Sequence, residues 1–209
     1  KDRQSMTPNT RQAEESIVPA KLNNRFYLMR HGQSLANEIG LIVCRPENAI
    51  SQYGLTPTGR LQVCDAITAS TLSSAALIVS SDYARARETA EIAYRILKTG
   101  DIESDTRLRE RSFGDWELKD HSAYTHIWEL DLLQTDEPQN NVEPVASVLK
   151  RTLDCIMDLD ARFDSRQIVL VGHGDVLQIA LAHFAGIQAH RHRSLKPLKN
   201  AEIRLLVSI

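Results

Sequence analysis

Three short apolar runs stand out along the chain, and each predicts a buried strand. They cover residues 25–30, 77–80 and 168–171. Short apolar runs that end at charged or turn-forming residues are typical of strands covered on both faces. Weaker signals predict an edge strand around Ile102 and a final strand over residues 203–207.

Between these runs, apolar residues at helical spacing and helix-start signals predict the helices. Thr56 and Pro57 indicate a helix start, with the threonine as its cap and the proline in the first turn. Gly100 indicates the end of a helix over residues 84–97, and Pro144 falls in the first turn of a long helix over residues 143–163. The remaining predicted helices cover residues 34–39, 124–133 and 175–184, with loops over residues 41–54, 107–116 and 134–141.

Strand and helix alternate through most of the chain, which predicts one α/β domain with a largely parallel sheet covered on both faces. The predicted domain spans residues 25–209, and a chain of 209 residues can form one sizeable core. Residues 1–24 are mostly polar, contain Pro8 and Pro19, and show no apolar period. We therefore predict a flexible arm ahead of the domain.

Composition narrows the classes of function. The formal net charge of −2 gives no electrostatic case for nucleic-acid binding. No apolar stretch approaches the length of a membrane span, and the first residues hold no secretory segment. The three cysteines, Cys44, Cys64 and Cys155, are widely separated, which favours a reducing compartment over a disulfide framework or a zinc site. We expect a cytoplasmic protein, although an organelle remains an alternative if a targeting segment was removed upstream.

Candidate chemistry follows each of the three strong strands. Arg30 and His31 end the first, Arg85 lies in the helix turn after the second, and His173 stands between two glycines after the third. Open α/β folds bind ligands at the carboxyl edge of the sheet, where neighbouring strands end together. An arginine holds a phosphate through paired hydrogen bonds, and an imidazole can attack phosphorus or donate to a phosphate oxygen.

Glu110 is a further candidate, in the charged loop predicted over residues 107–116. A glutamate beside a phosphate site can protonate a leaving oxygen if burial or a nearby anion raises its pKa. Any of these residues alone is more often a surface, core or capping residue. Together, Arg30, Arg85 and His173 supply the converging donors that a phosphate dianion needs. No dense Asp/His cluster indicates a metal, so we expect these cations to act in its place, without a metal or cofactor.

Four segments resemble the histidine phosphatase superfamily, in its phosphoglycerate-mutase-like branch. In chain order they are LMRHGQSLANE (28–38), SSDYARARETA (80–90), LRERSFGDWE (108–117) and VGHG (171–174). The resemblance covers about residues 25–209 and implies a three-layer α/β/α sandwich with a central, mostly parallel sheet. It also implies that His31 becomes transiently phosphorylated, that Arg30, Arg85 and His173 bind the phosphoryl group, and that Glu110 gives and takes the proton.

The resemblance extends to the substrate pocket. Ser34 and Asn37 match positions that commonly line it, Gly174 lets a ligand approach the backbone closely, and Gln33 stands where many members carry glutamate. The predicted substrate-binding set is Arg30, Ser34, Asn37, Arg85, Glu110, His173 and Gly174. Residues considered for the pocket mouth are Arg45, Lys119, His121, Tyr124 and His126. Trp116 and Trp128 are either a wall for an organic substrate or part of the core.

These residues predict a phosphomonoester hydrolase that acts on a small phosphorylated metabolite through a phosphohistidine. A mutase would pass the phosphoryl group to a second hydroxyl and exclude water. Mutases of this type usually carry a longer insertion between the glutamate and the second histidine, and the interval from Glu110 to His173 is short. Hydrolysis is therefore favoured over mutase-type transfer. The intact site also argues against an inactive binding or scaffold member, and the sequence indicates neither the substrate nor the oligomeric state.

Overall fold

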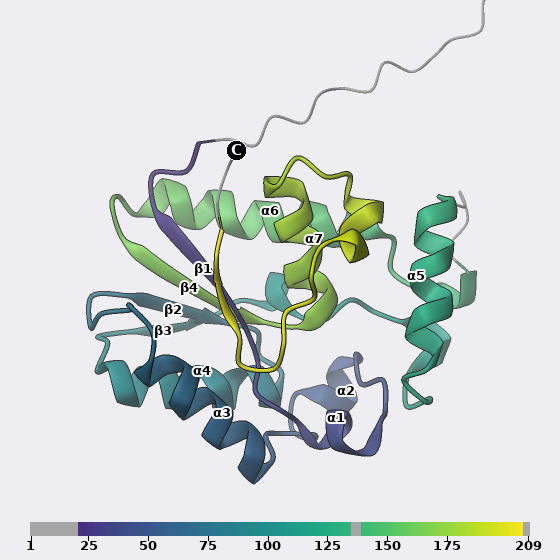
Figure 1. The fold of residues 1–209 in the computed structure, drawn as a ribbon, viewed down its shortest axis with the longest axis horizontal. Helices are drawn as coiled ribbons and strands as arrows, with labels where there is room; N and C mark the ends of the chain where they lie inside the picture. The colour runs from purple at the N-terminus through teal and green to yellow at the C-terminus, as the bar shows by residue number, and fades with distance from the viewer. Residues whose placement is uncertain (1–20, 135–138, 207–209) are drawn as a thin grey trace, which may run out of the picture.

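The computed structural model describes residues 21–134 and 139–206, and a five-stranded sheet forms its centre (Figure 1). The strands are β1 (Arg25–Arg30), β2 (Leu77–Ser80), β3 (Ile102–Ser104), β4 (Gln167–Gly172) and β5 (Ile203–Leu205). They lie in the order β3-β2-β4-β1-β5; β5 runs antiparallel to β1, and the other pairs are parallel. The predicted, mostly parallel sheet is confirmed, with β4 between β1 and β2.

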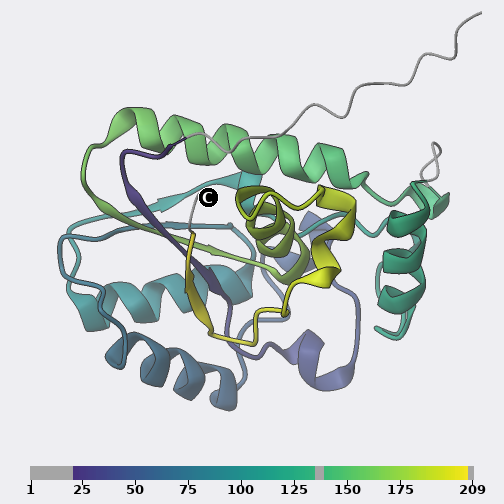
Figure 2. The same cartoon turned by 45° about the horizontal axis from the view of Figure 1, so that its top comes forward.

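Helices cover both faces of the sheet (Figures 1 and 2). One face carries α6 (Val145–Arg162) and α7 (Gly174–Phe184), and the other carries α3 (Pro57–Thr68) and α4 (Ala84–Leu97). Alternate strand residues serve the two layers: Phe26 and Leu28 belong to the core beneath α6 and α7, whereas Met29 belongs to the core beneath α3 and α4. The three-layer architecture is thus confirmed.

Smaller elements lie beyond the carboxyl ends of the strands, with α5 standing apart at the right of Figure 1. They are α1 (Leu35–Ile39), α2 (Pro46–Ala49), α5 (Ala123–Leu133), and the 3₁₀ turns η1 (Thr106–Leu108), η2 (Gly114–Trp116), η3 (Gln139–Asn141) and η4 (Ala189–Ser194). Within residues 21–134 and 139–206, no helix combines the length and apolar character needed to cross a bilayer.

The structure differs from the sequence prediction where short elements carry no apolar period. The loop predicted over residues 41–54 contains α2, which Pro46 begins, and the loop over residues 107–116 contains η1 and η2. No element was predicted where η4 forms. Pro144 is the N-cap of α6 and not a residue of its first turn. The C-cap of α4 is Lys98, in the left-handed region at φ 55°, so Gly100 does not end that helix.

The predicted arm, residues 1–24, lies mostly outside the described residues. Its last part is described and is bonded to the domain: the backbone N–H groups of Asn23 and Asn24 donate to Asp160 Oδ1 at 2.9 and 3.0 Å. Asn24 is also buried. The folded domain therefore includes residues ahead of the predicted boundary at 25. Residues 135–138 of the predicted linker and residue 207 of the last predicted strand also lie outside the description.

Candidate active site

The candidate site lies where β1, β4 and β2 end side by side. Arg30 of β1 pairs with Gly172 of β4, and Ser80 of β2 pairs with Val171 of β4, so the three strands end at the same level. A cavity of about 210 Å³ lies at these strand ends, with Arg30 of β1 in its lining. Four of the five predicted catalytic residues line it: Arg30, His31, Arg85 and Glu110. The fifth, His173, lies directly behind Arg85.

His31 turns its Nε2 atom toward Arg85 as part of a neutral imidazole. Its Nδ1 atom lies 2.7 Å from the carbonyl oxygen of Gly32, and because a carbonyl only accepts, Nδ1 carries the proton. Nε2 then has a lone pair, which accepts from the Arg85 Nε–H group at 3.1 Å. Burial, followed by the charges of Arg85 and Arg30, lowers the pKa of His31 well below its ordinary value. The site therefore holds an uncharged ring with a nucleophilic nitrogen.

The loop that carries His31 has no room for a side chain at Gly32. A Cβ atom there would lie 2.4 Å from the carbonyl oxygen of Gly59 in α3, and a Cβ atom at Gly59 would lie 2.0 Å from the carbonyl oxygen of Gln33. The backbone of this loop thus packs directly on the backbone of α3. This contact holds the Gly32 carbonyl group, which accepts the hydrogen bond from His31, in place. The Gln33 side chain accepts from Thr56 Oγ1 at 2.8 Å and does not line the cavity.

Arg30 and Arg85 keep buried donors that no described residue uses. Arg30 Nη1 donates to the Leu198 carbonyl oxygen at 2.8 Å, and Arg85 Nη2 donates to that of Val43 at 2.9 Å. Among the described residues, Arg30 Nε and Arg85 Nη1 are buried without a partner. Burying unpaired cationic donors is unfavourable unless another group binds them. Two such donors beside the nucleophile indicate a site for an anion.

His173 is fully buried behind Arg85. Its Nδ1 atom accepts from Arg85 Nε at 3.2 Å, so the proton is on Nε2, which lies 2.9 Å from Ser81 Oγ. Burial, then the charge of Arg85, lowers the pKa of His173 well below its ordinary value. The ring is therefore neutral, and both its nitrogens are engaged. Donation to a phosphate oxygen would require protonation, which an incoming dianion favours.

Glu110 enters the cavity from the loop after η1. Its Oε1 atom accepts from the backbone N–H of Arg111 at 2.9 Å. Burial raises the pKa of the Glu110 carboxyl, and the negative charge of Asp175 adds to that effect against the opposing charges of Arg85 and Arg30. A raised pKa favours the protonated acid, which is the form that can donate to a leaving oxygen.

Ser34, Asn37 and Gly174 also line the cavity, as predicted for the substrate side. Ser34 Oγ accepts from the Asn37 backbone N–H at 3.2 Å, and Asn37 Oδ1 accepts from that of Ser34 at 3.1 Å. This reciprocal cap of α1 holds both side chains at the cavity wall. A Cβ atom at Gly174 would lie 3.9 Å from both Arg30 Cζ and Glu110 Oε2. The glycine therefore leaves open the space between the cation and the acid.

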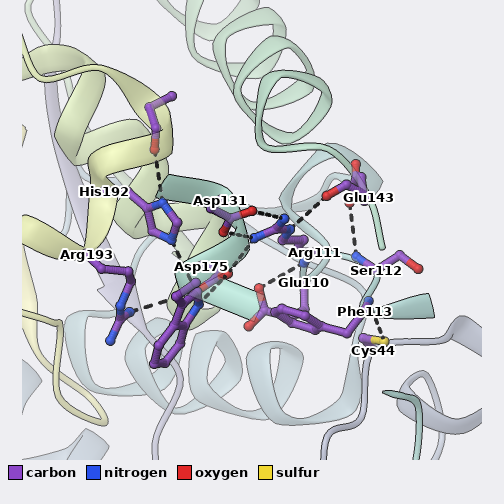
Figure 3. Close-up of polar contacts among 12 residues, drawn as sticks. Cys44, Glu110, Arg111, Ser112, Phe113, Asp131, Glu143, Asp175, His192 and Arg193 are labelled. Carbon is purple, nitrogen blue, oxygen red and sulfur yellow. Dashed lines mark hydrogen bonds and ion pairs between the residues drawn. The ribbon is translucent and has the colours of Figure 1, made fainter. Parts of the chain in front are cut away.

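Sequence reasoning considered Tyr124 and Trp128 for the pocket but missed Asp175 and Arg193, which also line the cavity (Figure 3 shows these two). Trp128 Nε1 donates to both carboxylate oxygens of Asp175 at 3.1 Å. Arg193 lies over the Trp128 ring, with Cζ 3.7 Å from the ring centroid and Nη1 3.8 Å from Asp175 Oδ1. The available signal was the run of His and Arg at residues 190–193, but no pattern shows which of them points inward.

A buried ion-pair network holds this side in place. The two terminal nitrogens of Arg111 donate to the two carboxylate oxygens of Asp131 in α5 at 2.7 Å, and Nη1 also reaches Asp175 Oδ2 at 3.3 Å. Burial opposes ionisation of Asp175, but His192, Arg111 and Arg193 outweigh it and hold the pKa of Asp175 at about 2. We call this side the α5 wall; its members are Arg111, Tyr124, Trp128, Asp131, Asp175 and Arg193.

Comparison with known proteins decides the family. Residues 26–208 match the model of the histidine phosphatase superfamily, branch 1. The chain belongs to the histidine phosphatase superfamily. The match takes in both sides of the cavity, the strand ends as well as the α5 wall.

Related proteins place this histidine phosphatase among the phosphoglycerate-mutase-like enzymes. The adenosylcobalamin/alpha-ribazole phosphatase of Salmonella typhimurium is 30% identical over 79% of this chain and 81% of its own length. A probable phosphoglycerate mutase of Erwinia tasmaniensis is 27% identical over 86% of this chain and 82% of its own. The structure of Bacillus stearothermophilus YhfR superposes with a TM-score of 0.74 at 26% identity, covering 87% of this chain and 90% of that one.

The residues considered for the pocket mouth of this histidine phosphatase divide into two groups. Those that line the cavity are His121, Tyr124 and Trp128. Those outside its lining are Arg45, Trp116, Lys119 and His126. Arg45 Nη2 donates instead to the carbonyl oxygen of Gly114 at 3.1 Å. Trp116 packs against a small apolar cluster around Phe113, so of the two tryptophans only Trp128 forms a wall of the cavity.

Proposed function

We propose that this enzyme hydrolyses a small phosphomonoester through a phosphohistidine formed at His31. One observation carries the proposal: two buried donors without a described partner, Arg30 Nε and Arg85 Nη1, beside the Nε2 lone pair of His31. A phosphate dianion satisfies both donors and brings its phosphorus atom to the nucleophile.

In the first transfer, Nε2 of His31 attacks phosphorus in line with the ester oxygen. The N–P bond forms as the P–O bond breaks, and Glu110 gives its proton to the leaving oxygen, so that a neutral alcohol departs. The Nδ1–H bond to the Gly32 carbonyl oxygen stabilises the positive charge on the ring. Arg30 and Arg85 balance the charge that develops on the peripheral oxygens.

In the second transfer, water attacks the phosphorus of the phosphohistidine. The Glu110 carboxylate takes a proton from that water, the P–N bond breaks, and its electron pair returns to Nε2 of His31. Phosphate leaves, and the enzyme returns to its starting protonation state. Support for water as acceptor comes from the cavity edge, where the exposed side chain of His121 indicates an opening to solvent.

The charge and size of the cavity support a reaction without metal on a compact substrate. In this cavity, guanidinium groups supply the positive charge that a bound metal ion supplies in metal-dependent enzymes. Within residues 21–134 and 139–206, no three His, Cys, Asp or Glu side chains are grouped as a metal site. A cavity of about 210 Å³ is also smaller than the common ligand pocket of about 300–1,000 Å³. A relative in Mycolicibacterium vanbaalenii, 28% identical, is named glucosyl-3-phosphoglycerate phosphatase, which supports a phosphorylated metabolite as substrate.

Phosphoryl transfer within a sugar acid is the second candidate, favoured by the 27% identity to a probable phosphoglycerate mutase. One assay separates the two functions: inorganic phosphate and 2-phosphoglycerate are followed together from 3-phosphoglycerate, with and without 2,3-bisphosphoglycerate. A panel of phosphomonoesters is assayed in parallel, before and after dialysis against EDTA. We expect phosphate release that survives EDTA, with little isomerisation. Primed isomerisation faster than phosphate release would make the enzyme a mutase, and no turnover of any ester would favour a binding protein.

A further inference from the structure

Arg193 places a third guanidinium group at the cavity, next to Asp175 and Trp128. It comes from η4, and its side chain is 23% exposed. Its guanidinium forms no hydrogen bond with a described residue. The nearest carboxylate oxygen, Asp175 Oδ1, is 3.8 Å from Nη1, which is beyond hydrogen-bond distance. A mostly buried cation thus keeps its donors for another partner.

The ring of Trp128 supports this guanidinium from one side. Arg193 Cζ lies 3.7 Å from the centroid of the Trp128 ring. Trp128 is itself held by its bonds to Asp175, and it stacks on Tyr124 with centroids 5.3 Å apart and planes 7° apart. A guanidinium above an aromatic ring is attracted to the ring face, and its N–H groups that do not face the ring can form a two-point contact with an anion.

An alternative role for Arg193 is to balance the negative charge of Asp175. That carboxylate already accepts from Trp128 at both oxygens and from Arg111 Nη1 at 3.3 Å. Arg111 is buried within the α5 wall, where it pairs with both Asp131 and Asp175. Because Arg111 already pairs with Asp175, the hydrogen-bond donors of Arg193 remain available for another partner.

We infer that Arg193 binds a second anionic group, a carboxylate or another phosphate, on the alcohol part of the substrate. The preferred substrates are then compact phosphomonoesters that carry a negative charge at both ends. The inference rests on the proposed function: the phosphoryl group occupies Arg30 and Arg85, and the leaving oxygen faces Glu110. Since Glu110 and Arg193 line the same cavity, the alcohol part extends from the acid toward Arg193 (Figure 3).

Binding of phosphonates, which the enzyme cannot hydrolyse, tests the inference without turnover. Titration calorimetry compares propylphosphonate with 3-phosphonopropionate and 1,3-propanediphosphonate. Because a charge-assisted hydrogen bond contributes about 1.5–3 kcal/mol, at least one doubly anionic ligand should bind wild-type enzyme about tenfold to hundredfold more tightly than propylphosphonate. The better of the two shows whether the second group is a carboxylate or a phosphate.

Three variants make the measurement specific. Arg193→Gln should lose the preference for the doubly anionic ligands, and Arg193→Lys, which keeps the charge but not the planar edge, should lose part of it. Arg191→Gln is the matched control, since Arg191 is exposed on the same turn and does not line the cavity; it should keep the full preference. Circular dichroism establishes whether each variant is folded. If Arg193→Gln is not folded, the comparison is made with Arg193→Lys instead.

Turnover separates failure of this inference from failure of the proposed function. The substrates are propyl phosphate and the phosphate ester of 3-hydroxypropionate. If wild-type enzyme hydrolyses neither but keeps its binding preference, the hydrolase proposal fails and the Arg193 site stands. If it hydrolyses both, and the ratio of their kcat/KM values is the same in Arg193→Gln, the Arg193 site is overturned. An equal loss of affinity for all three phosphonates in that variant would overturn it too.

Discussion

The phosphate side of the cavity and the α5 wall are built by different means. On the phosphate side, Arg30, His31 and His173 lie at the ends of β1 and β4, so backbone pairing in the sheet places them. In the α5 wall, side chains from distant segments place one another: Arg111 and Asp175, which are 64 residues apart, form an ion pair between the loop after η1 and α7.

Under the proposed function and the inferred role of Arg193, the phosphate side carries the chemistry and the α5 wall carries the selectivity. Parallel-strand pairing places Arg30, His31 and His173 without help from the wall, so the phosphate side should tolerate substitutions in the wall. The wall depends on buried charges, where removal of one partner leaves the other without compensation. Substitutions on the two sides should therefore have separable consequences, and the predictions below are arranged to test this.

The largest expected effect is that of His31→Ala, which removes the nucleophile from the phosphate side. Turnover should fall about 10⁴-fold or more. The fold should persist, because the substitution removes a ring whose neighbours, Arg30 and Arg85, belong to separate elements. Phosphate release and the urea midpoint are measured together. His126→Ala is the control, since His126 is exposed and outside the cavity. Near-wild-type turnover in folded His31→Ala would remove His31 from the nucleophile role.

Glu110→Gln should separate proton transfer from phosphate binding. The variant cannot protonate the leaving oxygen, so hydrolysis of alkyl phosphates should fall about 10²- to 10⁴-fold, and that of p-nitrophenyl phosphate much less. The ratio of the two kcat values is the measurement. Glu129→Gln, an exposed glutamate of α5, should leave that ratio unchanged. Equal losses on both substrates would mean that Glu110 positions the substrate without donating a proton.

Arg111→Leu should damage the wall through stability. The substitution leaves Asp131 and Asp175 buried without their shared partner, so the free energy of unfolding should fall by about 3–5 kcal/mol. The matched control is Arg162→Leu, which breaks the exposed pair between Arg162 and Glu103 and should change that free energy by about 1 kcal/mol or less. Urea unfolding measures both. Similar losses in the two variants would show that the buried network does not hold the wall.

Asp175→Asn should give the smallest effect, a shift in pH dependence. Burial, then the charge of Asp175, raises the pKa of Glu110 and so favours the protonated acid. Without the Asp175 charge the pKa of Glu110 falls, and the acid loses its proton at a lower pH. The alkaline limb of the kcat/KM profile, which reports the free enzyme, should therefore move to lower pH. An unchanged or upward-shifted limb would contradict electrostatic coupling between the wall and the catalytic acid.

The strands were predictable because their signals are contiguous. The apolar runs of β1, β2 and β4 are covered on both faces along most of their length, so consecutive residues carry the signal. Short elements gave no such signal: α2 and η4 are too brief for an apolar period, and the end of α4 depends on the left-handed backbone of Lys98. Their conformations come from local backbone bonds and from the surrounding fold.

The same contrast holds within the site. Arg30, His31, Arg85 and His173 were found because each lies just past a recognisable strand. Arg193 was not found, because its role depends on contact with Trp128, and no local pattern links those two residues. Asp175 directly follows a predicted motif residue, but its importance arises only when Trp128 and Arg111 reach it from other segments.

The Nε–H group of Arg85 lies between two imidazoles, 3.1 Å from His31 Nε2 and 3.2 Å from His173 Nδ1. The lone pair of His31 Nε2 is therefore already engaged by a hydrogen bond. Under the proposed mechanism, this bond must break before Nε2 can attack phosphorus, and a phosphoryl group that accepts from Arg85 competes for the same guanidinium. An uncharged alkylating agent offers Arg85 no such acceptor, so His31 should react with it slowly.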